Sequence, residues 1–460
     1  MFATTFPQNH LQQLSGNNTK SELLIPYTML PENQRKQIIS LINREVVPAM
    51  GCTEPIAVAL CACRAAELLG CVPTKVRVAL SANILKNAMG VGIPGTGMIG
   101  LPIAIALGVT IGKSCYELEV LKDVSPEAVS RAEKLIDAGI IDIALKEDTK
   151  EKLYIEVETS DSDGNSATAV ISGGHTNFVL LKKGDETVLD RRKPQGIEET
   201  EEKVNLSMRT VWEFAMTTPI DEIRFILESR RLNKAAAEQS FAGNYGHQVG
   251  RTLHCARQRT IMGDSPFSRV ISYTSAACDA RMAGAPIPVM SNSGSGNQGI
   301  AATLPVVVYA EEVFASEEKT IRALILSHLT VIYIKQSLGR LSALCGCVVA
   351  ATGSACGICY LMGGDYEQIV ATTKNMVANL TGMICDGAKP SCSMKLSSGV
   401  STAVISAMMA MEGQCVTSVE GIIDDDIDKT ISNLTHIGRD GMNETDHLIL
   451  DIMTHKGECL

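Results

Sequence analysis

The stretch that decides the fold runs from Arg340 to Met394 and reads RLSALCGCVVAATGSACGICYLMGGDYEQIVATTKNMVANLTGMICDGAKPSCSM. It contains six of the chain's 15 cysteines, which are Cys345, Cys347, Cys356, Cys359, Cys385 and Cys392. The first four lie in an apolar run of small residues, and the last two follow a predicted helix, Tyr366 to Leu380. This arrangement lets two elements that are distant in sequence bring thiol ligands to one metal centre.

Three interpretations of these cysteines stay open at this point. As small apolar fillers they would be buried, since free cysteine is among the most buried residue types. A redox dithiol at Cys356-Gly-Ile-Cys359 is less favoured, because such motifs open a helix near a βαβ unit and this one lies inside an apolar run. The third interpretation is a metal site, since thiolates bind zinc or iron-sulfur clusters. Cys385 and Cys392 are seven residues apart, unlike the short knuckles of zinc motifs, so the spacing leans toward an iron-sulfur cluster.

The length and the net charge of the chain limit the classes of protein to which it can belong. With 460 residues the chain is long enough for two or more domains around large cores. Its net charge is −10, and no basic run is long enough to follow a phosphate backbone. Nucleic acid is therefore not an expected partner.

The N-terminal segment MFATTFPQNHLQQLSGNNTKSELL (1–24) lacks the charged and then apolar pattern of an export signal. We therefore expect a cytoplasmic protein whose cysteines stay reduced and serve as ligands or nucleophiles. Three stretches, 89–112, 282–310 and 341–364, carry no charge and are long enough to span a membrane. Prolines interrupt the first two, and all three are rich in Gly and Ser. We interpret them as buried core around a site, with a membrane span as the minor alternative.

The remaining sequence predicts an α+β fold. Residues 31–50 have the spacing of an amphipathic helix that ends at Pro48. Residues 71–200 combine short helices with strands separated by Gly-containing turns, which is typical of a small α/β domain. From Val204 onward nearly every segment is helical in periodicity or composition. The predicted domains are 1–70, an N-terminal arm with helices of the main domain; 71–200, a smaller inserted α/β domain; and 201–460, the main helical domain.

One helix start and two loops are candidate functional elements. Gly51-Cys52-Thr53-Glu54-Pro55 precedes an apolar helix, and the dipole of a helix favours the thiolate of a cysteine at its start. A buried cysteine at a turn is an equally good explanation. The loop Gly90–Gly97 lacks the Gly-Lys-Ser/Thr ending of a nucleotide-binding loop, so it indicates at most an anion site. The loop Ser291–Gly299, SNSGSGNQG, is a candidate anion-binding nest, with a flexible surface loop as the alternative.

Four motifs taken together resemble the L-cysteine desulfidase family, which is similar to the iron-sulfur L-serine dehydratases. They are GCTEP at 51–55, LKNAMGVGIPGTG at 85–97, SNSGSGNQGIAATLPV at 291–306, and ALCGC with NLTGMICDGAKPSC between 343 and 392. The resemblance covers about residues 30–455, including GRDGMNETDHLILDIM at 438–453. The related dehydratases look to have His-Thr where this chain has Cys52-Thr53, which favours the desulfidase branch.

The resemblance implies a 4Fe-4S cluster held by three cysteines, with one iron open for the substrate, in a helical catalytic domain joined to a small α/β domain. The ligands carried over are Cys345, Cys385 and Cys392, with Cys347 as the alternative to Cys345. Cys52 matches the family's proposed proton acceptor. The implied reaction is the α,β-elimination of L-cysteine to hydrogen sulfide, ammonia and pyruvate, which would make the chain a carbon-sulfur lyase of cysteine catabolism.

These residue types suit that chemistry. Elimination needs a base with a pKa near the ambient pH to remove the Cα proton, and a Lewis acid to stabilise the departing sulfur. The groups expected to hold the carboxylate and the amine of the substrate are Lys86, Asn87, Ser291, Asn292, Ser293 and Gly294. Expelling hydroxide from serine would also need a general acid, and neither His247 nor His254 lies in a motif that supplies one. We therefore expect cysteine to be the better substrate.

Other functions stay open. An L-serine dehydratase would use the same cluster, and a pyridoxal-phosphate lyase would form a Schiff base on Lys86 or Lys389. From a different class, a non-catalytic metal or redox sensor would use the same thiols. The expected partner is a small amino acid, with no membrane and with a homodimer as the candidate assembly. The sequence leaves open the oligomeric state, the choice between cysteine and serine, and the role of Cys459 near the C-terminus.

Overall fold

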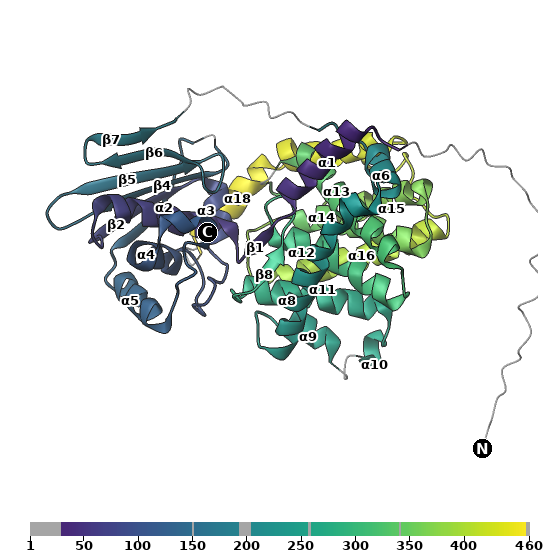
Figure 1. Cartoon of the computed structure of the whole chain (residues 1–460), viewed down its shortest axis with the longest axis horizontal. Coiled ribbons are helices and arrows are strands. Elements are labelled where there is room, and N and C mark those ends of the chain that lie inside the picture. The colour runs from purple at the N-terminus through teal and green to yellow at the C-terminus, as the bar shows by residue number, and fades with distance from the viewer. Residues whose placement is uncertain (1–28, 150, 193–203, 256–258, 340–341, 457–460) are drawn as a thin grey trace, which may run out of the picture.

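The computed structural model describes residues 29–149, 151–192, 204–255, 259–339 and 342–456. These residues form two lobes, a larger one made of helices and a smaller one built on a sheet (Figure 1). The chain is therefore a mainly helical α+β protein, as the sequence predicts.

Within the described residues, six strands form the sheet of the smaller lobe, in the order β3-β2-β4-β5-β6-β7. Strands β2 and β3 pair in parallel, and all other neighbours are antiparallel. The strands are β2 (Lys75–Leu80), β3 (Ile141–Leu145), β4 (Tyr154–Ser160), β5 (Ser166–Ser172), β6 (Phe178–Lys183) and β7 (Glu186–Asp190). The helical segments of this lobe are α2 (Thr53–Leu69), α3 (Ala82–Ala88), α4 (Leu101–Ile111), the 3-10 helix η1 (Ser114–Glu119) and α5 (Pro126–Asp137).

Helix α2 covers one face of this sheet. Strands β2 and β4 bury alternate residues, as expected for a sheet that has one face on a core. Helix α2 is buried almost all round and packs on β4 and β5 and against α4. The sequence assigns residues 53–69 to the main domain, but in the structure they pack against the sheet. Periodicity shows that a helix is buried, but it does not show which element the helix packs against. The predicted domain limits otherwise stay predictions.

The larger lobe consists of helices around a second hydrophobic core. Its helices α11, α12, α13, α14 and α16 pack against one another. The helical segments outside the smaller lobe are α1 (Glu32–Glu45), α6 (Met208–Thr217), α7 (Ile220–Ile223), η2 (Arg224–Ile226), α8 (Leu227–Ala242), α9 (Val249–His254), α10 (Arg259–Met262), α11 (Pro266–Met282), α12 (Gly296–Glu312), α13 (Glu317–Leu338), α14 (Gly346–Met362), α15 (Tyr366–Leu380), α16 (Cys392–Met411), α17 (Ile427–His436), η3 (Ile437–Gly441) and α18 (Asn443–Thr454).

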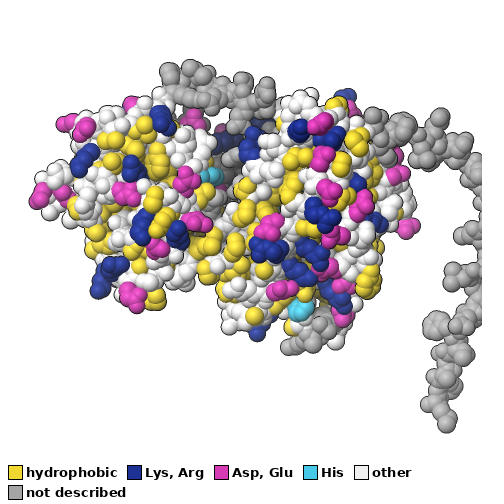
Figure 2. Space-filling model, in the orientation of Figure 1, with side chains coloured by type: hydrophobic (Ala, Val, Ile, Leu, Met, Phe, Trp, Pro, Cys, Tyr) yellow, Lys and Arg dark blue, Asp and Glu magenta, His cyan; other side chains and the backbone are white. Residues whose placement is uncertain are grey.

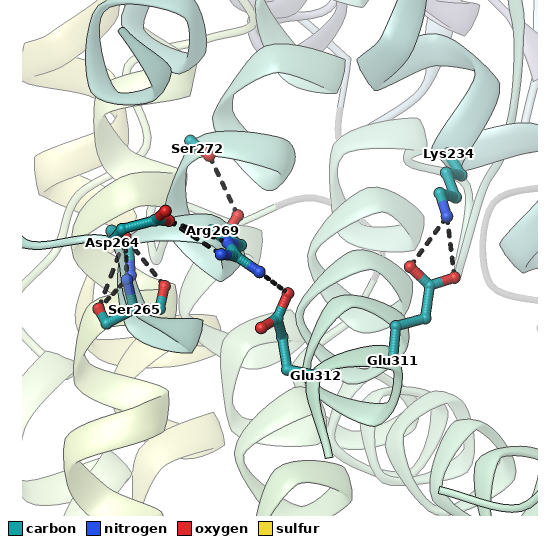
Figure 3. A network of polar contacts seen from close by, with 8 residues as sticks. Lys234, Asp264, Ser265, Arg269, Ser272, Glu311 and Glu312 are labelled. Carbon is teal, nitrogen blue, oxygen red and sulfur yellow. Dashed lines mark hydrogen bonds and ion pairs between the residues drawn. The ribbon is translucent and has the colours of Figure 1, made fainter. Parts of the chain in front are cut away.

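Ion pairs fix the C-terminal end of α12. Lys234 of α8 contacts both carboxylate oxygens of Glu311 at 2.9 Å (Figure 3). Arg269 of α11 pairs with the neighbouring Glu312 and with Asp264 (Figure 3). Each partly exposed pair of this kind contributes little stability. Together they hold this end of α12 between α8 and α11, while the N-terminal end of α12 faces the smaller lobe.

Contacts at several places join the two lobes. Strand β1 (Pro48–Met50) pairs in antiparallel fashion with β8 (Pro288–Met290), immediately before α2 begins. In the Gly-rich loop that follows α3, the N–H of Gly92 donates to the carbonyl of Met282 at 2.9 Å, so this amide serves the contact between lobes instead of an anion. Helix α18 leaves the larger lobe and packs against α3 (Figure 1).

The uncharged stretches fold mainly as buried helices with the loops that lead into them. The stretch 89–112 contains α4, 282–310 contains α12 except for its last two residues, and the described part of 341–364 contains α14. Among the described residues, no helix combines the length and the apolar character needed to cross a membrane. Basic and acidic side chains alternate over the face shown in Figure 2, and the surface is hollowed between the lobes.

Candidate active site

Residues of both lobes line a cavity of about 470 Å³. The larger lobe contributes the segments 293–298 and 342–347 and the loop that precedes α16. The smaller lobe contributes the start of α2, the segment 151–153 and the turn between β5 and β6. Five of the described cysteines are part of the lining, namely Cys52, Cys345, Cys347, Cys385 and Cys392. The predicted cluster ligands and the predicted proton acceptor therefore share one cavity.

Backbone pairing brings Cys345 and Cys385 together. The N–H of Cys345 donates to the carbonyl of Met383 at 3.0 Å, and the N–H of Cys385 donates to the carbonyl of Ala343 at 2.7 Å. The residues between these hydrogen bonds form an isolated antiparallel β-bridge. Because both cysteines are adjacent to the bridged pair, their side chains lie on the same face of this short ladder.

A tight loop places the third thiol. Cys392 is the first residue of α16, and its thiol contacts the carbonyl of Gly387 at 3.7 Å. Gly387 has a φ of +89°, and a Cβ there would lie 2.1 Å from the carbonyl oxygen of Lys86. Only glycine therefore allows this loop to lie against α3.

Lys86 supports this loop and is not part of the cavity lining. Its ammonium group donates to the carbonyl of Cys385 at 3.3 Å and forms an ion pair with Asp446 of α18. The Lys86 side chain is 2% exposed and that of Asp446 is 20% exposed. In the structure Lys86 thus contacts the loop and α18, and its predicted contact with the substrate stays a prediction. Its neighbour Asn87 does line the cavity.

The thiols interact electrostatically. The pKa of Cys345 is lowered to about 7, mainly because the Cys347 thiol donates a hydrogen bond to it. The same hydrogen bond, with burial, raises the pKa of Cys347 well above its usual value. Burial and the charge of Cys345 raise the pKa of Cys385, and burial raises that of Cys392 to about 11. Several thiolates in one buried place repel one another, and a bound metal cation relieves this repulsion.

The three thiols are chemically suited to a metal group, since thiolates bind zinc and iron-sulfur clusters. Cys345 is the N-cap of α14, Cys385 lies in the loop before α16, and Cys392 begins α16, and all three line the same cavity. Among the described residues, no three His, Cys, Asp or Glu side chains are arranged to hold one metal ion.

Four of the described helices point their N-terminal ends at the cavity. They are α2 with Cys52 at its N-cap, α12 with Ser295 at its N-cap, α14 with Cys345 at its N-cap, and α16, which begins at Cys392. Each end carries partial positive charge and N–H groups without helical partners. The cavity therefore favours anionic contents such as thiolates, a negatively charged cluster and a carboxylate.

Cys52 lies at a helix start, as predicted, but its pKa moves in the opposite direction from the expected one. Its thiol is 4% exposed and donates to a carboxylate oxygen of Glu54 at 3.0 Å. Burial first, and then the charge of Glu54, raise its pKa well above the usual value, and the charge of Arg281 opposes this only in part. The helix dipole is thus outweighed by desolvation and by an adjacent carboxylate.

Of the predicted loop Ser291–Gly299, residues 291–295 form an ordered turn held by buried polar groups, and residues 296–299 begin α12. The hydroxyl of Ser291 donates to the carbonyl of Val47 at 2.6 Å, and the amide nitrogen of Asn292 lies 3.0 Å from Nδ1 of the buried His328. Ser291 and Asn292 therefore fix the turn and are not among the lining residues, and their predicted substrate contact stays a prediction. The next two residues of the predicted set, Ser293 and Gly294, line the cavity.

Arg281 is a cavity residue that sequence reasoning missed. It is 4% exposed, and its Nη1 and Nη2 donate to the side chain of Asn297 at 3.0 Å and the carbonyl of Gly51 at 2.9 Å. A Cβ at Gly296 would lie 2.2 Å from Nε of Arg281, so glycine is needed for α12 to begin against the guanidinium. A signal was present, because Arg281 is the charge that immediately precedes the uncharged stretch 282–310.

A histidine of the smaller lobe was also missed. His175, in the turn between β5 and β6, lines the cavity together with Glu151 and Lys152. The Gly-Gly-His sequence of this turn was a weak signal. His254 instead stacks on Phe241, with 4.4 Å between ring centroids, away from the cavity lining.

The remaining cysteines of the decisive stretch are core residues. Cys356 and Cys359 lie within α14, are buried, and do not belong to the cavity lining. Burial raises their pKa values to about 12 and about 11, which is unsuited to a reactive dithiol. Cys459 lies outside the described residues.

Comparison with known proteins places the chain in a family. Residues 115–451 match the serine dehydratase alpha chain family. Relatives named UPF0597 protein include one from Bacteroides fragilis, 69% identical over 93% of this chain and 100% of the relative. Others come from Oleidesulfovibrio alaskensis, 48% identical over 91% of this chain and 97% of the relative, and from Shewanella pealeana, 45% identical over 91% and 98%. These names state no activity. Since the family match runs from the smaller lobe into the last helix, the chain belongs to the serine dehydratase alpha chain family.

Proposed function

We propose that this member of the serine dehydratase alpha chain family is an L-cysteine desulfidase. It would eliminate hydrogen sulfide from L-cysteine and release aminoacrylate, which hydrolyses to pyruvate and ammonia. The family supports a lyase-type enzyme. The observation that supports elimination of sulfide from L-cysteine in particular is that three thiols suited to an iron-sulfur cluster and the buried thiol of Cys52 line one cavity.

The proposed cofactor is a 4Fe-4S cluster held by Cys345, Cys385 and Cys392. When bound, it would supply a Lewis-acidic iron that stabilises the sulfur leaving the substrate. Cys345 is preferred over Cys347 as the ligand, because Cys347 donates its proton toward Cys345 and the pKa of Cys345 is lowered to about 7. A thiol that is already close to ionisation binds metal with less competition from protons.

The chain's own residues would hold the substrate and move its proton. Arg281 and the N-terminal end of α12 offer the positive charge and the N–H donors that a carboxylate needs. Asn87 and Ser293 are the proposed partners of the amine. Cys52 faces the same cavity and is the proposed acceptor of the Cα proton.

The two lysines predicted to form the Schiff base of a pyridoxal-phosphate lyase lie outside the cavity lining. Lys86 pairs with Asp446, and Lys389 pairs with Asp386 at 2.7 Å. Two other lysines, Lys152 and Lys335, do line the cavity, so only the predicted Schiff-base residues are disfavoured.

L-Serine dehydratase is the second candidate, and His175 is the observation that favours it. Expelling hydroxide needs a proton donor, and an imidazole at the cavity could supply one. Sulfide is the better leaving group and needs no such donor. We propose that cysteine is the better substrate by at least about tenfold in kcat/KM, which is roughly 1.4 kcal/mol of transition-state discrimination.

One experiment tests this choice. The protein is purified without oxygen, its iron and acid-labile sulfide are measured, and sulfide release from L-cysteine is compared with pyruvate formation from L-serine. Equal or faster turnover of serine would reject the desulfidase and leave the cluster proposal intact. A His175→Gln variant should lose serine turnover and keep cysteine turnover.

Cys52→Ser separates proton transfer from cluster binding. This variant should keep its iron but lose sulfide release, because a hydroxyl at that position does not form the anion that a thiol can. Retained activity would remove Cys52 from the mechanism.

A further inference from the structure

Cys52 and Glu54 form a buried thiol–carboxylate pair at the start of α2. The Cys52 thiol donates to Oε2 of Glu54 at 3.0 Å. The two residues are 4% and 8% exposed, and both line the cavity. Glu54 is thus the hydrogen-bond partner of the very thiol proposed to take the substrate proton.

Charge balance limits how Cys52 can become a thiolate. If its proton left for solvent, two negative charges would lie in contact in a buried site, where Coulomb repulsion is strong. Desolvation and the charge of Glu54 are the reasons that the pKa of this thiol is raised. If the proton instead moves to Glu54, the pair keeps a single negative charge.

Arg281 balances that single charge. Its guanidinium donates to the carbonyl of Gly51, the residue before Cys52, at 2.9 Å, and it is itself buried. Its charge favours the anionic form of Cys52. The pair and Arg281 together therefore stay neutral whichever of the two partners holds the proton.

We propose that Glu54 is a catalytic residue that accepts the proton of Cys52 and so creates the thiolate base; this rests on the proposed elimination reaction. The S–H bond of Cys52 breaks and an O–H bond forms on Glu54. The thiolate then takes the Cα proton, the electrons of the Cα–H bond form the Cα=Cβ bond, and the Cβ–S bond breaks with its electrons on the departing sulfur. The proton on Glu54 leaves with that hydrosulfide as hydrogen sulfide, so nothing is oxidised or reduced.

The test uses Glu54→Gln in the holoenzyme. The amide keeps the shape and can accept a hydrogen bond, but it does not accept the proton. We expect kcat for sulfide release to fall by roughly 100-fold or more at neutral pH, the usual contribution of a general base. The variant should keep its iron and should regain activity as the pH rises, because hydroxide then ionises Cys52 directly.

A second measurement does not depend on turnover. The rate at which iodoacetamide alkylates Cys52, followed by peptide mass spectrometry as a function of pH, reports how readily this thiol ionises. If Glu54 takes the proton of Cys52, the parent protein holds thiolate at neutral pH that Glu54→Gln lacks, so in the variant both alkylation and catalysis should be slower at neutral pH and should recover as the pH rises. If Glu54 acts only through its negative charge, its removal should instead make alkylation of Cys52 faster at neutral pH.

The matched control is Glu67→Gln. Glu67 lies on the same helix and accepts a hydrogen bond from Cys63 at 3.6 Å, but neither residue lines the cavity. This variant removes the same charge from a second thiol–carboxylate pair, and its sulfide release should stay within about threefold of the parent.

The outcomes separate the two proposals. Glu54→Gln with activity within threefold of the parent, or with unchanged or faster alkylation of Cys52 at neutral pH, overturns the role of Glu54. If the parent protein turns over neither cysteine nor serine, the proposed function fails. The alkylation profile alone then decides whether Glu54 controls the ionisation of Cys52.

Discussion

Replacing Lys86 by Met tests whether this lysine supports the loop of Cys385 or binds the substrate. Methionine keeps most of the buried apolar stem and removes the ammonium group. Removing one partner of a buried ion pair costs about 3–5 kcal/mol. Because the Asp446 side chain is 20% exposed and regains some hydration, we expect the lower part of that range, about 3–4 kcal/mol.

The measurement is the apparent free energy of unfolding from urea titrations, for Lys86→Met, for Asp446→Leu and for the double variant. The double variant leaves no uncompensated charge, so it should lose less than the sum of the single variants, by roughly 1–2 kcal/mol. The KM of the fraction that retains iron should stay within about twofold. A tenfold rise in KM with unchanged stability would refute the structural role and restore Lys86 to the substrate site.

Three further predictions follow from the site. Arg281→Gln should raise the KM for L-cysteine by roughly 10- to 100-fold, which corresponds to the loss of a hydrogen bond to a charged group. Inhibition by cysteamine, which lacks the carboxylate, should not change. An equal loss of affinity for both ligands would contradict a carboxylate site at Arg281. Cys345→Ala should abolish iron binding. Cys356→Ala removes a thiol from the middle of α14 and should keep the iron. The iron content of each variant after anaerobic purification tests this difference. His328 has its pKa lowered to about 3 by burial, so below about pH 6.5 the unfolded chain takes up a proton that the native protein does not. Stability is therefore complete above that pH and falls by up to roughly 1.4 kcal/mol per pH unit toward pH 3. His328→Gln should flatten this slope in acid denaturation. An unchanged slope would show that His328 is not the group responsible for the loss of stability.

The geometry around His328 explains why it stays neutral. The amide nitrogen of Asn292 can only donate, so Nδ1 accepts, and the proton of the ring lies on Nε2, which faces Thr303 at 3.0 Å. The Thr303 hydroxyl in turn donates to the carbonyl of Gly299 at 2.7 Å. A second proton on the ring would face the amide donor of Asn292. The turn that lines the cavity is thus built on a neutral imidazole.

The cysteines of the cavity were selected through the resemblance to a family's motifs, because spacing and residue type alone left a buried apolar role, a redox dithiol and a metal site open. The structure places the selected residues, Cys52, Cys345, Cys385 and Cys392, around one cavity. The mainly helical α+β fold was predictable from the residues themselves, since periodicity and turn residues are local signals.

The substrate side was less predictable, because burial and distant partners decide it. Nothing near Lys86 in the sequence shows that its partner is Asp446, 360 residues later. Arg281 and His175 were missed because their roles come from the packing of α12 and of a sheet turn against the cavity. The direction of the Cys52 pKa shift was wrong because the sequence does not show how deeply the thiol is buried or that Glu54 folds back onto it.

Helix α18 has a consequence for the order in which the protein can fold. The loop of Cys385 rests on Lys86, and Lys86 is paired with Asp446, which lies 360 residues later in the chain. The helices that carry the cysteines can pack before α18 docks, but the loop of Cys385 gains this support only afterwards. A chain whose α18 has not docked would therefore hold the thiols of the cavity on a loop that lacks one of its supports.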